Sequence, residues 1–191
     1  MINRRQFIQA IATLSASLPL EAMASNNILG QENNAVYRYL TDPWLTLAVV
    51  QEHLLPADGT SPGAQDIMAL RYLRNNLDAP DTSNEQRKFI IDGVGWLNDL
   101  SQQDFQLPFI QLTKDNKEII LRQVERSRVG SRWLSRMMTY LIEALLSDPV
   151  YGGNKNQLGW QWLHHIPGYP RPSVDNVYFK VGGIIRRRTK A

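Results

Sequence analysis

The sequence contains no cysteine, and this absence removes several classes of chemistry at once. It excludes disulfide bonds, iron–sulfur clusters, thiolate zinc sites, covalent haem attachment and cysteine nucleophiles. The common catalytic signatures are missing as well: the chain has no HExxH zinc motif, no GxSxG nucleophile turn, no Walker phosphate loop and no GxGxxG fingerprint. The chain by itself therefore gives little support to an enzymatic function.

A large excess of one charge sign is also lacking, because the formal net charge is only +3. With 191 residues, 43% hydrophobic and 20% charged, the chain is long and apolar enough for one soluble domain with a real core. Basic residues gather at the C-terminal end, at Arg186, Arg187, Arg188 and Lys190. No nucleic-acid motif accompanies them, so we expect a solvated tail and no nucleic-acid partner. Contact of this tail with anionic lipid or an acidic partner is the alternative.

Long hydrophobic runs are absent too, and the most apolar stretch reads as an export signal. This stretch is too short and too polar to remain in a membrane. In order, the signal comprises Arg4-Arg5 followed by Phe7, an apolar section from Ile8 to Leu20, and the small-x-small sequence Ala22-Met23-Ala24. We therefore predict a signal peptide at residues 1–24 and one mature domain at residues 25–191. The paired arginines resemble a twin-arginine signal, which exports folded proteins; an ordinary amphipathic helix is the alternative.

The mature chain shows the apolar spacing of α-helices and only weak strand signals. Asp42 followed by Pro43 indicates the start of a first helix, and Thr113 the start of another. Five helices are predicted, at residues 43–55, 64–77, 85–100, 113–127 and 131–147. The last is apolar over more than half its circumference, so we expect it at the centre of a mainly α fold. A short hairpin over residues 174–185 is a weak further prediction.

The stretch from Asp148 to Pro172 differs from the helices because it is rich in glycine, proline and aromatic residues. Glycine and proline disfavour regular helix or strand, yet the aromatics are too apolar for a disordered tail. We expect a long ordered loop that packs on the helices, docks on a partner, or does both. The residues assigned to partner docking are Tyr151, Gly152, Gly153, Asn154, Gly159, Trp160, Pro167 and Gly168.

The alternative function is that of a stand-alone periplasmic enzyme whose chemistry depends on histidine. A stand-alone enzyme would use His53 or the pair His164-His165, together with Asp58 or Asp148. Adjacent histidines point apart on a regular element, and no ligand spacing typical of metal sites is present. Capping or turn hydrogen bonds explain Asp58 and Asp148 more simply. We therefore assign no catalytic, cofactor-binding or metal-binding residue to this chain.

Three features in order resemble the gluconate 2-dehydrogenase subunit 3 family, the small subunits of membrane-associated flavin dehydrogenases for sugars and sugar acids. The first is the twin-arginine-like leader. The second is the helix ending in Leu54-Leu55-Pro56-Ala57-Asp58-Gly59-Thr60-Ser61-Pro62-Gly63-Ala64. The third is Asp148-Pro149-Val150-Tyr151-Gly152-Gly153-Asn154, followed by Gly159-Trp160 and Pro167-Gly168-Tyr169-Pro170. The resemblance covers nearly all of the mature chain.

This resemblance implies a non-catalytic small subunit in the periplasm, peripheral to the inner membrane. Its expected partners are a large GMC-type flavoprotein that carries FAD, a cytochrome c subunit that carries haem c, and the twin-arginine translocase. The leader of the small subunit would carry the folded flavoprotein across the membrane and support its maturation. A periplasmic scaffolding protein whose basic tail meets lipid is a further alternative.

Overall fold

The computed structural model describes residues 38–178 and 180, so the predicted signal peptide lies outside the described range, as does half of the predicted hairpin at 174–185. The chain divides into two compact units, residues 1–39 and 40–191, and only Arg38 and Tyr39 of the first unit are described. The described part of the second unit is helical and has no strand, which confirms the mainly α fold. Its α-helices are α3 (Pro43–Leu54), α4 (Ala69–Asp78), α5 (Asn84–Phe105), α6 (Lys114–Glu125), α7 (Arg128–Leu146) and α8 (Leu158–Trp162).

Side-chain caps set the start of four of these helices. Asp42 Oδ1 accepts a hydrogen bond from the Leu45 amide at 2.9 Å, and Pro43 occupies the first turn of α3. Ser83 and Thr113 cap α5 and α6 in the same way. The cap of α7 is Ser127, so this helix begins one turn earlier than the predicted start at residue 131.

Helix α4 begins at Ala69 and not at residue 64, which corrects the sequence-based boundary. Met68, just before it, has a left-handed backbone with φ of 57°, which a continuous right-handed helix does not allow. The chain forms turns between Ala64 and Met68, and the Ala64 amide donates to the Leu55 carbonyl at 2.8 Å. The loop between α3 and α4 is thus tied back to the end of α3.

Helix α5 runs to Phe105, beyond its predicted end near residue 100, and stops where Gln106 adopts a left-handed backbone. The buried Asn98 on α5 accepts a hydrogen bond from the Phe109 amide at 3.1 Å. This bond holds the short 3₁₀ turn η1 (Phe109–Gln111) against the bundle, with the Phe109 ring fully buried.

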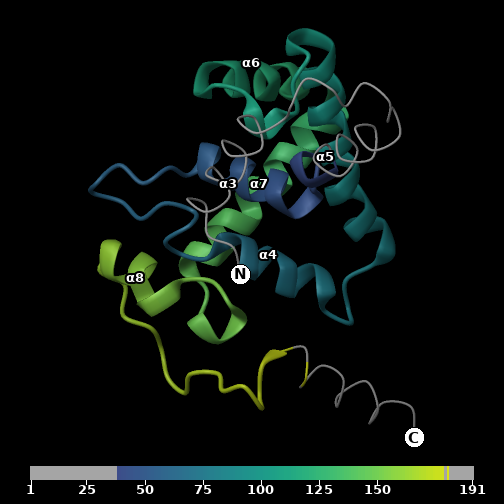
Figure 1. The fold of residues 1–191 in the computed structure, drawn as a ribbon. Coiled ribbons are helices and arrows are strands. Elements are labelled where there is room, and N and C mark those ends of the chain that lie inside the picture. Colours follow the sequence, from purple (N-terminus) through teal and green to yellow (C-terminus); the bar gives the residue numbers. More distant parts are fainter. Residues whose placement is uncertain (1–37, 179, 181–191) are drawn as a thin grey trace, which may run out of the picture. The chain divides into compact units, whose positions relative to one another are not determined.

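Helix α7 crosses the middle of the bundle, as its apolar circumference predicts (Figure 1). It contacts α3, α4, α5, α6 and α8. Trp133, Met137 and Leu141 on α7 are buried, and the Trp133 indole donates to the Ile90 carbonyl of α5 at 3.0 Å. Within the described residues, no helix is both long and apolar enough to cross a membrane. The end of α7 leads directly into the glycine- and aromatic-rich segment that the sequence singles out.

Candidate partner-docking site

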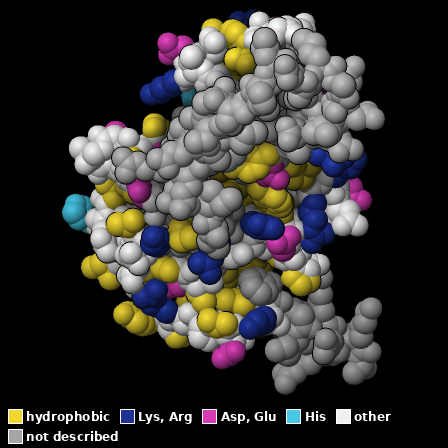
Figure 2. Space-filling model, in the orientation of Figure 1, with side chains coloured by type: hydrophobic (Ala, Val, Ile, Leu, Met, Phe, Trp, Pro, Cys, Tyr) yellow, Lys and Arg dark blue, Asp and Glu magenta, His cyan; other side chains and the backbone are white. Residues whose placement is uncertain are grey.

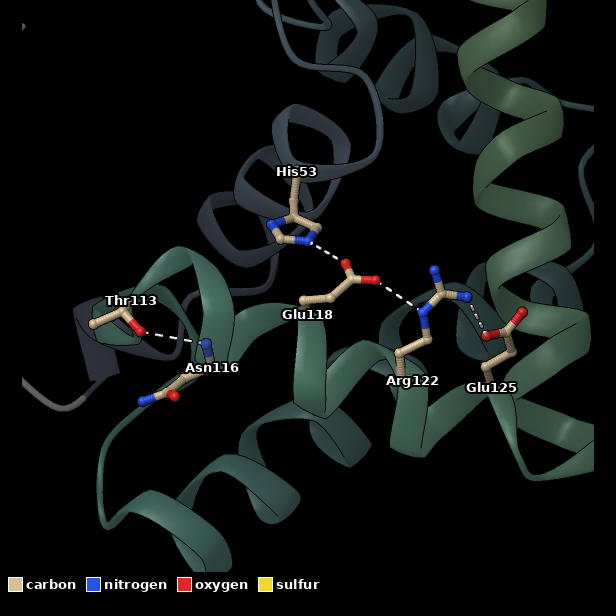
Figure 3. Close-up of polar contacts among 6 residues, drawn as sticks. All are labelled: His53, Thr113, Asn116, Glu118, Arg122 and Glu125. Atoms are coloured by element: carbon tan, nitrogen blue, oxygen red, sulfur yellow. Dashed lines mark hydrogen bonds and ion pairs between the residues drawn. The ribbon is translucent and has the colours of Figure 1, made fainter.

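The histidine of the enzymatic alternative, His53, contacts Glu118, a carboxylate other than the two named in that alternative. Its Nε2 lies 2.8 Å from Glu118 Oε2, which joins α3 to α6 (Figure 3). Glu118 also accepts from the Arg122 guanidinium at 2.8 Å, and Arg122 reaches Glu125 at 3.0 Å. The hydrogen bond from His53 lowers the pKa of Glu118, with a further contribution from Arg122. The His53–Glu118 contact thus joins two helices, the ion pairs of Arg122 lie within α6, and the histidine side chain is only 8% exposed.

The two aspartates named with the histidines are occupied by local hydrogen bonds. Asp58 Oδ1 accepts from the amides and hydroxyls of Thr60 and Ser61 at 2.7–2.9 Å, and these bonds hold the pKa of Asp58 well below its usual range. Asp148 caps the turn that follows α7 by accepting from the Val150 amide at 3.0 Å. Across residues 38–178 and 180, no cluster of three metal-ligating side chains is found.

Asn154 organises the segment after α7. Its side chain is completely buried, and its backbone is left-handed with φ of 44°, a conformation that asparagine tolerates better than most residues. Its Oδ1 accepts from the Gly159 amide at 2.8 Å, while its Nδ2 donates to the Ser147 carbonyl at 3.0 Å. One side chain therefore links the end of α7 to the start of α8.

Two glycines of the motif lie directly against the backbone of α7. A β-carbon built on Gly159 would lie 2.1 Å from the Leu145 carbonyl oxygen, and one on Gly153 would lie 2.6 Å from the Ala144 carbonyl oxygen. Both distances are far below van der Waals contact, so these positions require glycine for close packing. The segment is less irregular than predicted, because it contains the 3₁₀ turns η2 (Pro149–Tyr151) and η3 (Lys155–Gln157) and the short helix α8 that this contact accommodates.

Trp160 completes the contact between α8 and α7. Its side chain is 5% exposed, and its indole nitrogen donates to the Leu146 carbonyl at 2.7 Å. The Arg171 guanidinium lies over the indole, 5.1 Å from the ring centroid, and its Nε donates to Asp148 Oδ2 at 2.8 Å. Arg171 therefore clamps the C-terminal segment onto α8, a role the sequence did not indicate because the two partners are 23 residues apart.

The residues assigned to docking thus fall into two groups. Gly152, Gly153, Asn154, Gly159 and Trp160 are buried against the bundle, whereas Tyr151 and Pro167 are half-buried and Gly168 is exposed. Docking by these residues stays a prediction. The buried ones can affect a partner only indirectly, by fixing the position of the exposed part of the loop.

Large apolar side chains beside this motif point into solvent. Ile166 and Tyr169 are each 86% exposed, and Trp162 and Leu163 are 41% and 45% exposed. Hydrophobic and basic side chains lie together around α8 and the segment after it (Figure 2). Exposed apolar groups gathered in this way are typical of a surface that another protein covers. The name apolar ridge is used below for Trp162, Leu163, Ile166 and Tyr169.

The family model for gluconate 2-dehydrogenase subunit 3 matches residues 41–168. This chain belongs to that family. The match runs from the start of α3 to Gly168, so it includes the buried motif and nearly all of the apolar ridge. No curated protein and no solved structure matches the chain. The family is one of subunits, which implies that its members work beside partner subunits.

Proposed function

We propose that this protein is a non-catalytic small subunit of a periplasmic FAD-dependent dehydrogenase complex that acts on sugars, sugar acids or polyols. Its family membership is the observation that carries the proposal. The large subunit, a GMC-type flavoprotein, holds FAD and oxidises the substrate, and a cytochrome c subunit with haem c accepts the electrons. The complex is peripheral to the inner membrane.

The small subunit binds the flavoprotein through its apolar ridge, whose exposed side chains are of the kind that anchors interfaces. The glycine–aromatic motif beneath the ridge holds it on α7 through Asn154 and Trp160. Burying the ridge in a complex removes apolar surface from water and so favours association. The His53–Glu118 pair and the local bonding of Asp58 support a structural rather than a catalytic use of these groups.

Export follows the twin-arginine route, with Arg4, Arg5 and Phe7 in the recognised leader. The leader then serves both subunits, because the flavoprotein crosses the membrane already folded and bound to the small subunit. Replacement of Arg4 and Arg5 by lysine tests this step. Both proteins are expected to stay in the cytoplasm of the variant strain, and normal export would indicate a general secretory leader instead.

Co-purification tests the complex itself. The neighbouring reading frame is expected to encode the flavoprotein. When the tagged protein is isolated from the periplasm, this flavoprotein should co-purify with it and show sugar or polyol dehydrogenase activity. Recovery of the protein alone, with export and activity of the flavoprotein unchanged in a deletion strain, would refute the proposal.

Charge placed on the apolar ridge tests the docking surface. The double variant Ile166→Asp, Tyr169→Asp is expected to lose the flavoprotein while keeping its helical circular dichroism, because both side chains lie in solvent. Ile119→Asp is the matched control, since Ile119 is 51% exposed on α6, outside the ridge. Retention of the partner by the double variant at wild-type levels would exclude the ridge as the contact.

A further inference from the structure

A second surface, in which the ridge residues take no part, is an open groove between the first two turns of α5 and the stretch of α7 from Ser131 to Thr139. The groove has a volume of about 710 Å³. Helix α5 contributes Glu85, Gln86 and Phe89, and α7 contributes Ser131, Arg132, Ser135, Arg136 and Thr139. Apart from Phe89, its lining is polar or charged.

Two arginines form the α7 wall of this groove, on successive turns of the helix. Arg132 and Arg136 are exposed, and neither forms an ion pair with a carboxylate elsewhere in residues 38–178 and 180. The Arg132 guanidinium lies over the half-buried Phe89 ring, 5.7 Å from its centroid. Arg128, another exposed arginine with no ion pair among the described residues, stands one turn earlier on α7.

Hydroxyl groups accompany the two guanidinium groups. Ser131, Ser135 and Thr139 are exposed on the same part of α7, although the Thr139 hydroxyl already donates to the Ser135 carbonyl at 3.0 Å. Guanidinium and hydroxyl groups both donate hydrogen bonds to carboxylates, and arginine does so with two parallel N–H groups. The wall therefore offers several donors and positive charge, opposed in the lining by the single carboxylate of Glu85.

We infer that this groove binds an acidic segment of a partner protein, with carboxylates of the segment on Arg132 and Arg136. Residues four positions apart on a helix, such as Arg132 and Arg136, are separated by about 6 Å along its axis. Alternate residues of an extended chain are about 6.7 Å apart. An extended segment with acidic residues at every second position therefore matches the two arginines, and its intervening side chains point toward the α5 wall that holds Phe89.

The concave shape favours a peptide over a membrane surface. A bilayer surface would reach the ends of the arginines but not the half-buried Phe89 between the two helices. This surface is independent of the flavoprotein assignment, because it rests on the groove alone.

The binding test uses the purified full chain and a fluorescent peptide of five Glu-Ala repeats, with five Gln-Ala repeats as the neutral probe. Fluorescence anisotropy at low salt is expected to show binding of the Glu peptide alone. Arg132→Gln, Arg136→Gln should weaken it by about tenfold, which corresponds to about 1.4 kcal/mol. The control Lys114→Gln, Lys155→Gln removes the same charge from exposed sites outside the groove and should bind as wild type does.

A second pair of variants tests the groove from its other wall. Glu85→Gln removes the carboxylate that repels the probe and should tighten binding, whereas Asp104→Asn, near the far end of α5, should not. Equal effects of groove and control variants would show non-specific attraction and overturn the inference. Binding to phosphatidylglycerol vesicles without binding to the peptide, or no binding to either, would overturn it as well.

Discussion

Two glycines that lie two residues apart on α5 should respond in opposite ways to alanine. Gly93 packs against Trp133, and a β-carbon there would lie 2.0 Å from the indole Nε1 and 2.2 Å from Cε2. Trp133 is completely buried and donates a hydrogen bond to the Ile90 carbonyl, so it has no space into which to retreat. Gly95 has nothing within 4 Å of the corresponding position.

The expected loss in Gly93→Ala follows from three contributions. Overpacking against a fixed indole costs about 3 kcal/mol at this degree of overlap, and displacement of the indole hydrogen bond costs about 1 kcal/mol more. Alanine returns about 1 kcal/mol through its better helix propensity. The free energy of unfolding should therefore fall by about 3 kcal/mol, whereas Gly95→Ala should raise it by up to about 1 kcal/mol.

Urea unfolding of both variants and the wild type, followed by circular dichroism at 25 °C, measures these changes. In thermal melts the same energies correspond to a Tm lower by about 6–12 °C for Gly93→Ala and higher by about 2–4 °C for Gly95→Ala. Circular dichroism is preferred to tryptophan fluorescence because the first variant disturbs an indole. A Gly93→Ala protein as stable as Gly95→Ala would refute the close packing of α5 against Trp133.

Three further outcomes are expected. Gly159→Ala should destabilise the protein by about 2 kcal/mol through overpacking against α7, while Gly168→Ala, with open space around it, should leave the urea midpoint unchanged. Arg171→Ala should release the segment after α8 from Asp148 and Trp160, and its backbone amides should then exchange with solvent faster than those of Arg171→Lys, which keeps the positive charge. Because the pKa of Glu118 is lowered in the folded state, its stabilising contribution is complete above the unfolded pKa and declines as pH falls through the folded one. Between pH 7 and about pH 3, the free energy of unfolding measured with urea should therefore fall less in Glu118→Gln than in wild type. The same pH dependence of unfolding in both proteins would contradict the link to His53.

Local signals were sufficient to predict most of the fold. Asp42-Pro43 and Thr113 act within a few residues of themselves, so their capping roles can be read from the sequence. Met68 shows the limit, because its left-handed backbone interrupts a stretch whose apolar spacing continues through it. Periodicity alone does not report such a break.

The site was less predictable because tertiary contacts decide which of its residues are buried and which are exposed. Trp160 and Trp162 are two positions apart in one motif, yet the first is buried and the second is exposed. On a helix such neighbours point to different sides, and only the position of α7 decides which side is the interior. The pairing of Arg171 with Asp148 depends in the same way on a chain path that has no local signature.

The attachment of α8 also sets an order of events during synthesis. The carbonyls of Leu146 and Ser147, at the end of the central helix, receive their side-chain donors from Trp160 and Asn154, which the ribosome adds later. The apolar ridge is not held in place until α7 has formed and the Trp160 and Asn154 side chains have bound to its end. A partner that recognises the ridge would therefore bind only chains whose synthesis has passed α8. The hydrogen bonds that Trp160 and Asn154 make to the end of α7 would in this way make partner binding depend on completed folding of this region.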